Sequence, residues 1–308
     1  MKASSSSSGP SEWVTPLLVR VHAALRGGSG LEDLASLASS AFDHVDGPVP
    51  IEELAGSLGV AQVLTVPFDG ASGVLLRPDG RRGPLIIVPE AHAERRRRFS
   101  IAHEVAHLML GHLGLARATS EEERQADRLG ALLLLPPSRV RSAMADAPPD
   151  ARRIERLGEA FQVSIDAAAR AYAEFHRTPM VAIIARGGVV DRCYGGFGMP
   201  TVRLRIGDAV PAGSGASRPA GGRGRFRTCT LRDSSTWFKV PLRRPATFVE
   251  QVLRRRPDCS LVVLHEEGAP PLREARTGSG RVPRGQGVHL RAVGCQCPDE
   301  VVDRVVAP

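Results

Sequence analysis

Aromatic side chains, lysine and long apolar runs are all scarce in this sequence. Aromatic residues make up 4% of its 308 residues, whereas Gly and Pro number 32 and 24, a composition typical of a chain with many loops. No run of about 18 apolar residues occurs, so we predict no membrane-spanning helix. Residues 1–10 are Ser-rich and lack the apolar core of a signal peptide. The expected location is therefore the cytoplasm.

Lysine is nearly absent, because Lys2 and Lys239 are the only lysines among 41 basic residues. The net charge of +8 and the pI near 10.0 permit an acidic or nucleic-acid partner without requiring one. The five cysteines are an odd number and all lie from residue 193 onward, which does not fit an ordinary disulfide framework. We expect thiols of a reducing compartment, with a metal or redox pair at Cys295 and Cys297 as the open alternative.

What the sequence does contain is the H-E-x-x-H pattern of zinc peptidases, at His103-Glu104-Val105-Ala106-His107. Residues four apart on an α-helix are about 40° apart around its axis, so the two imidazoles share one side. Such a pair can hold a zinc ion at Zn–N distances of about 2.0–2.1 Å. Glu104 lies roughly a quarter-turn away, where it can reach a metal-bound water as general base without being a ligand.

The same short pattern also occurs by chance in proteins without metal. The flanks favour the metal interpretation, because an ionisable His-Glu-His set on an apolar helix is costly unless its polar groups are satisfied. The flanking apolar residues are Phe99, Ile101, Ala102, Val105, Ala106, Leu108, Met109 and Leu110.

A catalytic zinc site needs a third protein ligand. A third histidine in the pattern H-E-x-x-H-x-x-G-x-x-H is excluded, because Leu110 and Leu113 occupy the required Gly and His positions. His112 is instead expected to be an exposed or helix-end histidine, favoured by the negative C-terminal end of the helix dipole when it is protonated.

The other source of a third ligand is a carboxylate on the next helix, predicted over 119–135 and stopped by Pro136. Its first turn contains Glu121, Glu122 and Glu123, which could all be mere first-turn acids. We favour Glu123 as the ligand, because the small residues Ala126 and Gly130 flank its face and allow close helix packing.

Two further roles follow from that choice. Thr119 and Glu122 have the spacing of a capping box and become the predicted N-terminal cap. Asp127 follows Glu123 by four residues and is predicted to hydrogen-bond the free ring nitrogen of a ligand histidine, which fixes its tautomer.

These segments together resemble the ImmA/IrrE family of metallopeptidases, which are gluzincins with a Glu ligand in an E-x-x-A-[DN] helix. The matching residues are Arg98-Phe99, His103-Glu-Val-Ala-His107, Glu123-Arg-Gln-Ala-Asp127 and Leu133-Leu-Leu-Pro136. Gln125 and Leu129-Gly130 depart from the usual family pattern, outside the proposed ligands. The compound motif spans about 40 residues, and the wider similarity covers residues 45–175.

The resemblance implies a cytosolic zinc metalloendopeptidase with one Zn²⁺ per chain, held by His103, His107 and Glu123, with Glu104 as catalytic base. It also implies a protein substrate, a helix-turn-helix repressor cleaved at a specific site in a stress, DNA-damage or mobile-element response. Nucleic acid is a permitted partner, and no membrane partner is expected. The oxyanion-stabilising group is not assigned: Tyr172, His92 and His112 are candidates and none is favoured.

The rest of the chain predicts an α+β fold class in four parts. Residues 1–30 form a flexible N-terminus and leading helix, and 31–138 a compact gluzincin-like zinc peptidase core of helices and a small antiparallel sheet. Residues 139–178 form a helical segment resembling a helix-turn-helix, and 179–308 a β-rich α+β C-terminal domain of regulatory or sensor type. The core strands are expected at 62–67, 73–77 and 84–88, and the C-terminal strands at 180–184, 201–206 and 261–264.

The helix-turn-helix resemblance keeps a second function open. The chain could be a DNA-binding or ligand-sensing transcriptional regulator with a structural or vestigial metal site. Against this, Ala167-Ala168-Ala169 occupy the second helix of the pair, where a recognition helix needs polar side chains. A structural zinc site also fills all four positions with protein ligands, and no conspicuous fourth Cys or His stands near the motif except His112.

Overall fold

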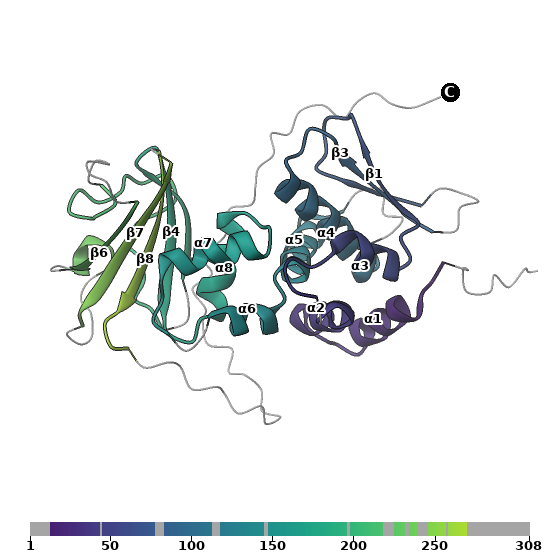
Figure 1. Ribbon diagram of the computed structural model, residues 1–308, viewed down its shortest axis with the longest axis horizontal. Coiled ribbons are helices and arrows are strands. Elements are labelled where there is room, and N and C mark those ends of the chain that lie inside the picture. The colour runs from purple at the N-terminus through teal and green to yellow at the C-terminus, as the bar shows by residue number, and fades with distance from the viewer. Residues whose placement is uncertain are drawn as a thin grey trace, which may run out of the picture. The chain divides into compact units, whose positions relative to one another are not determined.

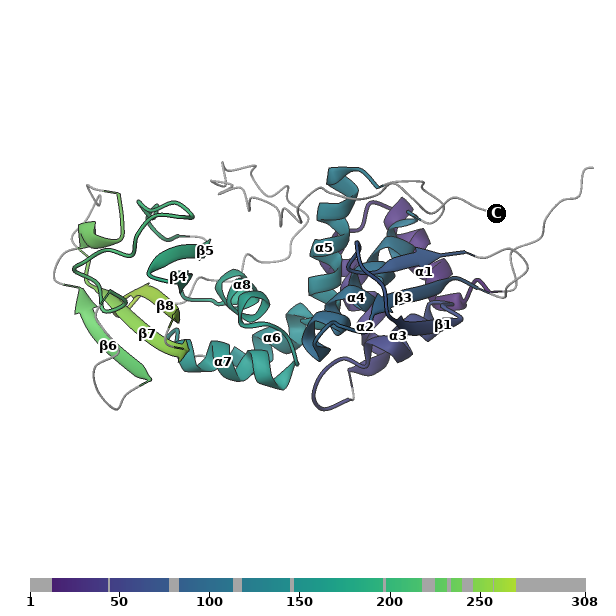
Figure 2. The ribbon, with the colours of Figure 1, turned by 90° about the horizontal axis from the view of Figure 1, so that it is seen from above.

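A computed structural model describes residues 13–269 except 44, 78–82, 113–117, 145–146, 196–197, 218–224, 232–233, 240–245 and 257. The described chain divides into two units, residues 13–38 with 50–131 and residues 39–49 with 132–269. Figures 1 and 2 show the helices and strands of each unit. No described helix is both long and apolar enough to cross a membrane.

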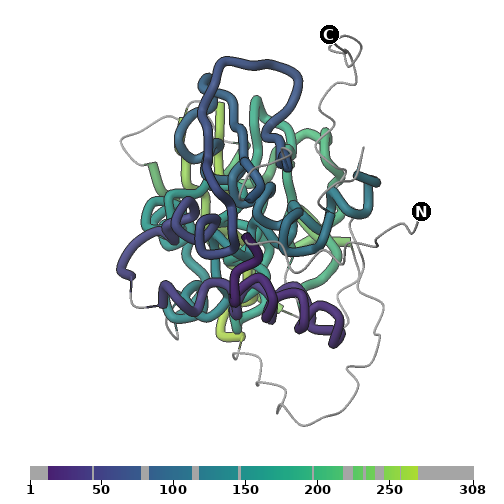
Figure 3. The backbone as a smooth tube through the Cα atoms, turned by 90° about the vertical axis from the view of Figure 1, so that its right-hand side faces the viewer, coloured from purple at the N-terminus to yellow at the C-terminus, as the bar shows by residue number. Residues whose placement is uncertain are grey.

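The first unit is built around one buried helix, α4 (Glu94–Leu110). Two helices, α1 and α3, and two strands, β2 and β3, pack against it. Figure 3 follows the chain from α1, in purple, towards this helix, in blue. The elements of this unit before α4 are α1 (Pro16–Arg26), α2 (Leu31–Ser39), α3 (Ile51–Ser57), β1 (Gln62–Val66), β2 (Val74–Leu76) and β3 (Leu85–Pro89). A 3-10 turn, η1 (Ser40–Phe42), follows α2.

The small sheet of this unit has the order β1-β3-β2. The antiparallel pairing predicted for the second and third strands is present between β2 and β3. The prediction of a wholly antiparallel sheet is wrong, because β1 pairs with β3 in parallel. Strands β1 and β2 therefore lie on opposite sides of β3. No local turn signal in the sequence encodes the crossing between them.

The burial of α4 follows from its position among these elements. All residues from Ser100 to Met109 are buried, so the H-E-x-x-H segment lies in the interior of the unit as predicted. The helix ends at Gly111, whose φ of 77° is left-handed, a conformation that glycine adopts without the steric cost of a Cβ atom.

The next helix, α5 (Ser120–Leu134), begins with the predicted capping box. The Thr119 backbone N–H donates to Glu122 Oε2 at 2.7 Å, and the Glu122 backbone N–H donates to Thr119 Oγ1 at 3.3 Å. Each side chain thus satisfies one of the backbone donors left free at a helix start. Pro136 follows the end of the helix, as expected.

The second unit joins three helices to a five-stranded antiparallel sheet of order β5-β4-β8-β7-β6. This sheet is the predicted β-rich C-terminal part. Its elements are α6 (Pro137–Met144), α7 (Ala151–Ala160), α8 (Ile165–Phe175), β4 (Met180–Arg186), β5 (Val189–Gly195), β6 (Phe226–Leu231), η2 (Ser234–Thr236), β7 (Phe248–Arg256) and β8 (Cys259–Glu266). The strand predicted at 201–206 is wrong, because only an isolated bridge from Val202 to Phe238 forms there.

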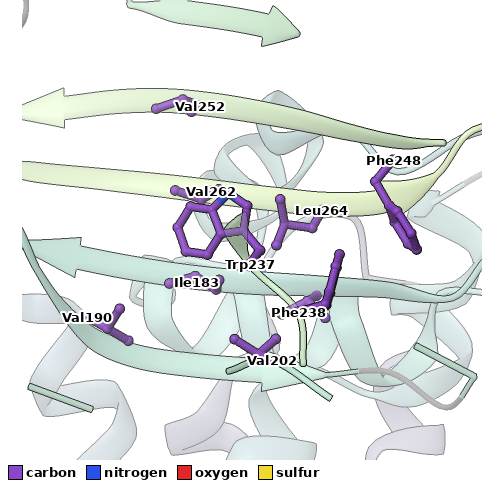
Figure 4. Close-up of a cluster of buried hydrophobic side chains, with 10 residues drawn as sticks. Ile183, Val190, Val202, Trp237, Phe238, Phe248, Val252, Val262 and Leu264 are labelled. Carbon is purple, nitrogen blue, oxygen red and sulfur yellow. The ribbon is translucent and has the colours of Figure 1, made fainter. Parts of the chain in front are cut away.

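One face of this sheet covers a hydrophobic cluster around Trp237 and Phe238 (Figure 4). Helix α8 packs against β4 and β5, and seven of its eleven residues are buried. Ser164 caps the helix, since its Oγ accepts from the Ala167 backbone N–H at 3.1 Å. The helix that a DNA-reading motif would present to the major groove is therefore mostly covered within its own unit, by α6 and α7 as well as by β4 and β5.

Candidate metal centre

The candidate centre lies where α5 approaches α4, near Gly130. Gly130 on α5 makes the approach feasible. A Cβ atom at that position would lie 3.1 Å from the backbone nitrogen of His103 and 3.2 Å from the carbonyl oxygen of Ala102. Ala126 is fully buried one turn earlier. The small residues noted in the sequence therefore set the helix spacing, as expected.

Three side chains from these helices point their donor atoms at one location. His103 Nε2 lies 3.0 Å from His107 Nε2 and 3.2 Å from Glu123 Oε2, and His107 Nε2 lies 3.7 Å from Glu123 Oε1. One donor atom from each residue lies within 4.8 Å of the others, and no other such cluster of three occurs among the described residues.

These separations suit a tetrahedral ion. Metal–donor bonds of about 2.0–2.2 Å at tetrahedral angles place neighbouring donors about 3.3–3.5 Å apart, and the three observed distances lie around that value. Two imidazoles and one carboxylate are also a common donor set for catalytic zinc. The group can hold a metal ion by both its chemistry and its geometry.

The cluster is open on one side. His103 and His107 are each 8% exposed, whereas the Glu123 side chain is 48% exposed. The two histidines are therefore buried in the core, whereas the Glu123 carboxylate lies at the surface. A site with three protein ligands and one open side leaves room for a water molecule or a substrate.

Each of the two histidines also contacts a further side chain through its other ring nitrogen, Nδ1. His103 Nδ1 lies 2.9 Å from Asp127 Oδ1, as the sequence predicted, and His107 Nδ1 lies 3.0 Å from His112 Nδ1. Burial lowers the pKa of His103, but the hydrogen bond to Asp127 and the charges of neighbouring carboxylates outweigh it and raise that pKa overall. Burial and the neighbouring His103 lower the pKa of His107.

Glu104 is a buried carboxyl beside this cluster and is only 6% exposed. Burial raises its pKa to about 7; the charge of His103 opposes that shift and the charge of Glu123 supports it. A backbone hydrogen bond with Leu75 of β2 holds the carboxyl in place. An acid with this pKa can both accept and release a proton near neutral pH.

Gly73 is a part of the site that the sequence reasoning missed. A Cβ atom at this residue would lie 2.8 Å from Glu104 Oε1, so a larger side chain there would push against the carboxyl. Gly73 was expected only to begin a strand. A signal for its role is lacking in the sequence, because it approaches Glu104 through the fold and not through a local motif.

The three candidates for an oxyanion-stabilising group are each engaged in other contacts. Tyr172 belongs to α8 of the second unit, where it is buried and its hydroxyl accepts from the Asp150 backbone N–H at 3.4 Å. His92 precedes α4, and its Nε2 accepts from Arg96 Nε at 3.0 Å. His112 contacts His107 from behind the cluster. That assignment stays open.

Comparison with known proteins supports the resemblance seen in the sequence. Residues 60–172 match the peptidase family model described as the IrrE N-terminal-like domain, which confirms the predicted family. The matched range contains all of α4 and α5. The chain shows no significant sequence similarity to a curated protein.

Among solved structures, the chain is similar to a Mycobacterium tuberculosis transcriptional regulator. The two are 13% identical, the match covers 81% of this chain and 93% of the other, and the TM-score is 0.47. A likeness at this level is not a basis for assigning function.

Proposed function

We propose that this protein, whose residues 60–172 form an IrrE N-terminal-like domain, is a zinc-dependent metalloendopeptidase. The observation that carries the proposal is the placement of a buried glutamic acid, with a pKa near 7, beside an open two-histidine, one-glutamate cluster. That combination is what hydrolysis of a peptide bond by an activated water requires.

In this proposal His103, His107 and Glu123 hold the zinc ion. The ion would supply Lewis acidity, polarising the substrate carbonyl and lowering the pKa of a water molecule to about 7. Asp127 accepts from Nδ1–H of His103, so that Nε2 of this ring presents a lone pair to the cluster.

Glu104 acts as the proton carrier. Its carboxylate takes a proton from the attacking water and passes it to the leaving amine. The backbone of Leu75 orients the group, and Gly73 leaves room for it. Burial keeps the carboxyl away from bulk water, so its pKa stays close to the working pH of a cytoplasmic enzyme.

The substrate we propose is a protein, namely a helix-turn-helix repressor cut at one site during a stress, DNA-damage or mobile-element response. The support for this part is the family resemblance of the compound motif. One further point agrees with a protein substrate: the cluster is open at Glu123. The net charge of +8 permits an acidic partner, be it protein or nucleic acid.

The test compares the wild type with Glu104→Gln. The variant keeps the shape of the side chain but cannot carry the proton. We expect metal content near one ion per chain in both proteins, and activity lower by about 10²–10⁴-fold in the variant. Mass-spectrometric mapping of new protein N-termini, in cells expressing each form, would identify the cut protein. Equal sets of N-termini in the two would contradict the proposal.

The second candidate function is a transcriptional regulator that binds DNA or a ligand and carries a structural or vestigial metal site. The pairing of α7 with α8 is the observation that favours it. The burial of α8 by β4 and β5 weighs against base reading by that helix. Specific duplex binding with a steep salt dependence, unchanged in Glu104→Gln, would favour this candidate.

A further inference from the structure

His112 was expected to be an exposed or helix-end histidine, and it does stand at the end of α4, directly after the cap residue Gly111. Gly111 adopts a left-handed conformation at the end of α4, and the His112 backbone N–H then donates to the His107 carbonyl at 2.9 Å. This turn folds His112 back against the helix. Its ring centroid lies 5.1 Å from that of His107, and their Nδ1 atoms are 3.0 Å apart.

The 3.0 Å separation of the two Nδ1 atoms fits a hydrogen bond with one donor and one acceptor. The other nitrogen of His107, Nε2, faces His103 and Glu123. If Nε2 presents its lone pair to a metal ion, the ring proton of a neutral His107 must be on Nδ1. Nδ1–H then donates, and His112 Nδ1 accepts.

We propose that His112 is a positioning residue for the metal centre, whose neutral imidazole accepts the Nδ1–H proton of His107 and fixes this ring as an Nε2 ligand. The inference rests on the proposed function, because it assigns a partner to one of the proposed metal ligands. His112 does not reach the cluster itself.

The two ligand histidines then have partners of different charge. Asp127 is a carboxylate, which accepts the proton of His103 and places negative charge behind that ring. His112 fixes the orientation of His107 without adding charge. Carboxylate partners make a ligand imidazole more basic and so weaken the Lewis acidity of the bound ion. One charged and one neutral partner orient both rings while leaving more positive charge on the ion.

The experiment measures metal affinity of the full-length chain by competition with a chelator, using Zn²⁺ and, separately, Co²⁺. His112→Ala removes the acceptor. His112→Asn keeps one, because the Asn amide oxygen can occupy the place of Nδ1. His22→Ala is the matched control, since His22 also packs on α4 through a bond from its ring to the Leu108 carbonyl, at 3.2 Å, without touching the cluster.

We expect His112→Ala to weaken Zn²⁺ binding by about 10–100-fold, the usual effect of losing such a partner. His112→Asn and His22→Ala should stay within about threefold of the wild type. A second readout is the ¹⁵N NMR signal of the imidazoles in the metal-free chain. His107 should be protonated at Nδ1 in the wild type and in His112→Asn, and a mixture of tautomers in His112→Ala.

Equal affinity in His112→Ala and the wild type would overturn this inference while leaving the peptidase proposal intact. Equal losses in His112→Ala and His112→Asn would also overturn it, because the acceptor would then not be what matters. A wild-type chain that binds no Zn²⁺ would instead overturn the proposed function. Far-ultraviolet circular dichroism of each metal-free variant establishes that it is folded before its affinity is compared.

Discussion

Each unit of this protein buries a pair of neighbouring histidines, and the two pairs differ in what surrounds them. In the first unit, every ring nitrogen of His103 and His107 faces another ionisable side chain. In the second unit, His176 and His265 bond only backbone groups through Nδ1. Their Nε2 atoms have no hydrogen-bond partner in the described part of the chain.

Among the pKa values, that of His103 sets the first pair apart, because the pKa of His107 is lowered like those of the two histidines of the second unit. Burial lowers the pKa of both His176 and His265, with backbone hydrogen bonds only partly opposing it. In the first unit carboxylates raise the pKa of His103 in spite of comparable burial. Burying two imidazoles together is thus not enough to assemble a donor set that could hold a metal ion. A second helix must also bring carboxylates to them, and here α5 does so with Glu123 and Asp127.

The largest expected effect tests this difference directly. His103→Ala removes a proposed ligand and should weaken Zn²⁺ binding by more than about a hundredfold, because even an outer partner contributes 10–100-fold. His176→Ala removes an equally buried histidine from the other unit and should leave the affinity unchanged. Elemental analysis of the purified variants checks both. Loss of metal from His176→Ala would contradict the claim that only the first histidine pair takes part in metal binding.

The next effect concerns Asp127, whose carboxylate contacts Nδ1 of the proposed ligand His103. Asp127→Ala should weaken Zn²⁺ binding by about 10–100-fold, since His103 loses the acceptor that fixes its tautomer. Asp166→Ala is the control in the second unit, where that carboxylate accepts from the Tyr194 hydroxyl at 2.8 Å. Chelator competition gives both affinities. Similar losses in the two variants would mean that the effect is not specific to the histidine.

A smaller effect compares two helical glycines. Gly130→Ala places a Cβ atom against the α4 backbone at 3.1 Å, whereas Gly158→Ala in α7 meets its neighbours at 3.5 Å or more. Alanine favours a helix over glycine by about 1 kcal/mol, but overpacking costs about 1–3 kcal/mol. Gly130→Ala should therefore lower the free energy of unfolding by about 1 kcal/mol, and Gly158→Ala should leave it equal or higher.

The two tryptophans allow each unit to be followed separately. Trp13 lies in the first unit and Trp237 in the second, so denaturant unfolding monitored by fluorescence in Trp237→Phe and Trp13→Phe backgrounds reports one unit at a time. If Gly130→Ala stabilised the first unit, the close approach of α5 to α4 would not be a steric limit.

A separate effect, told apart by its sign, is a pH dependence that runs in opposite directions in the two units, measured without metal in the presence of a chelator. Glu104 has a pKa raised from 4.5 to about 7, so the folded chain keeps its proton after the unfolded chain has lost it. The free energy of unfolding of the first unit should fall as pH rises from 4.5 to 7, by about 3 kcal/mol at most. Glu104→Gln should lack this component.

In the second unit the folded pKa of His176 is lowered from 6.5. The unfolded chain therefore binds the proton first, and this histidine destabilises the folded unit as pH falls below 6.5. Urea titrations from pH 5 to 8, read by the fluorescence of each tryptophan, give both slopes. Slopes of the same sign in the two units would contradict the contrast between a buried acid and a buried base.

Local patterns predicted much of the fold. The capping box at Thr119, the stop at Pro136 and the buried helix around the H-E-x-x-H segment all follow from residues near one another in sequence. The strands that were missed, β5, β6 and β7, are rich in Arg and polar residues and lie between loops. Two of them pair with a strand next to them in sequence, since β5 follows β4 across Gly187-Gly188 and β7 directly precedes β8. The polar side chains along these strands interrupt the apolar runs by which the other strands were predicted.

The candidate site divides in the same way. The sequence by itself determined that His103 and His107 share one helix face and that Glu123 and Asp127 share another, because helical periodicity fixes directions within one helix. The tertiary structure alone decided that β1 pairs in parallel with β3, that Gly73 lies against Glu104 and that the His112 ring contacts the His107 ring. These depend on how separate elements pack, and packing is set by the whole set of buried surfaces and not by spacing along the chain.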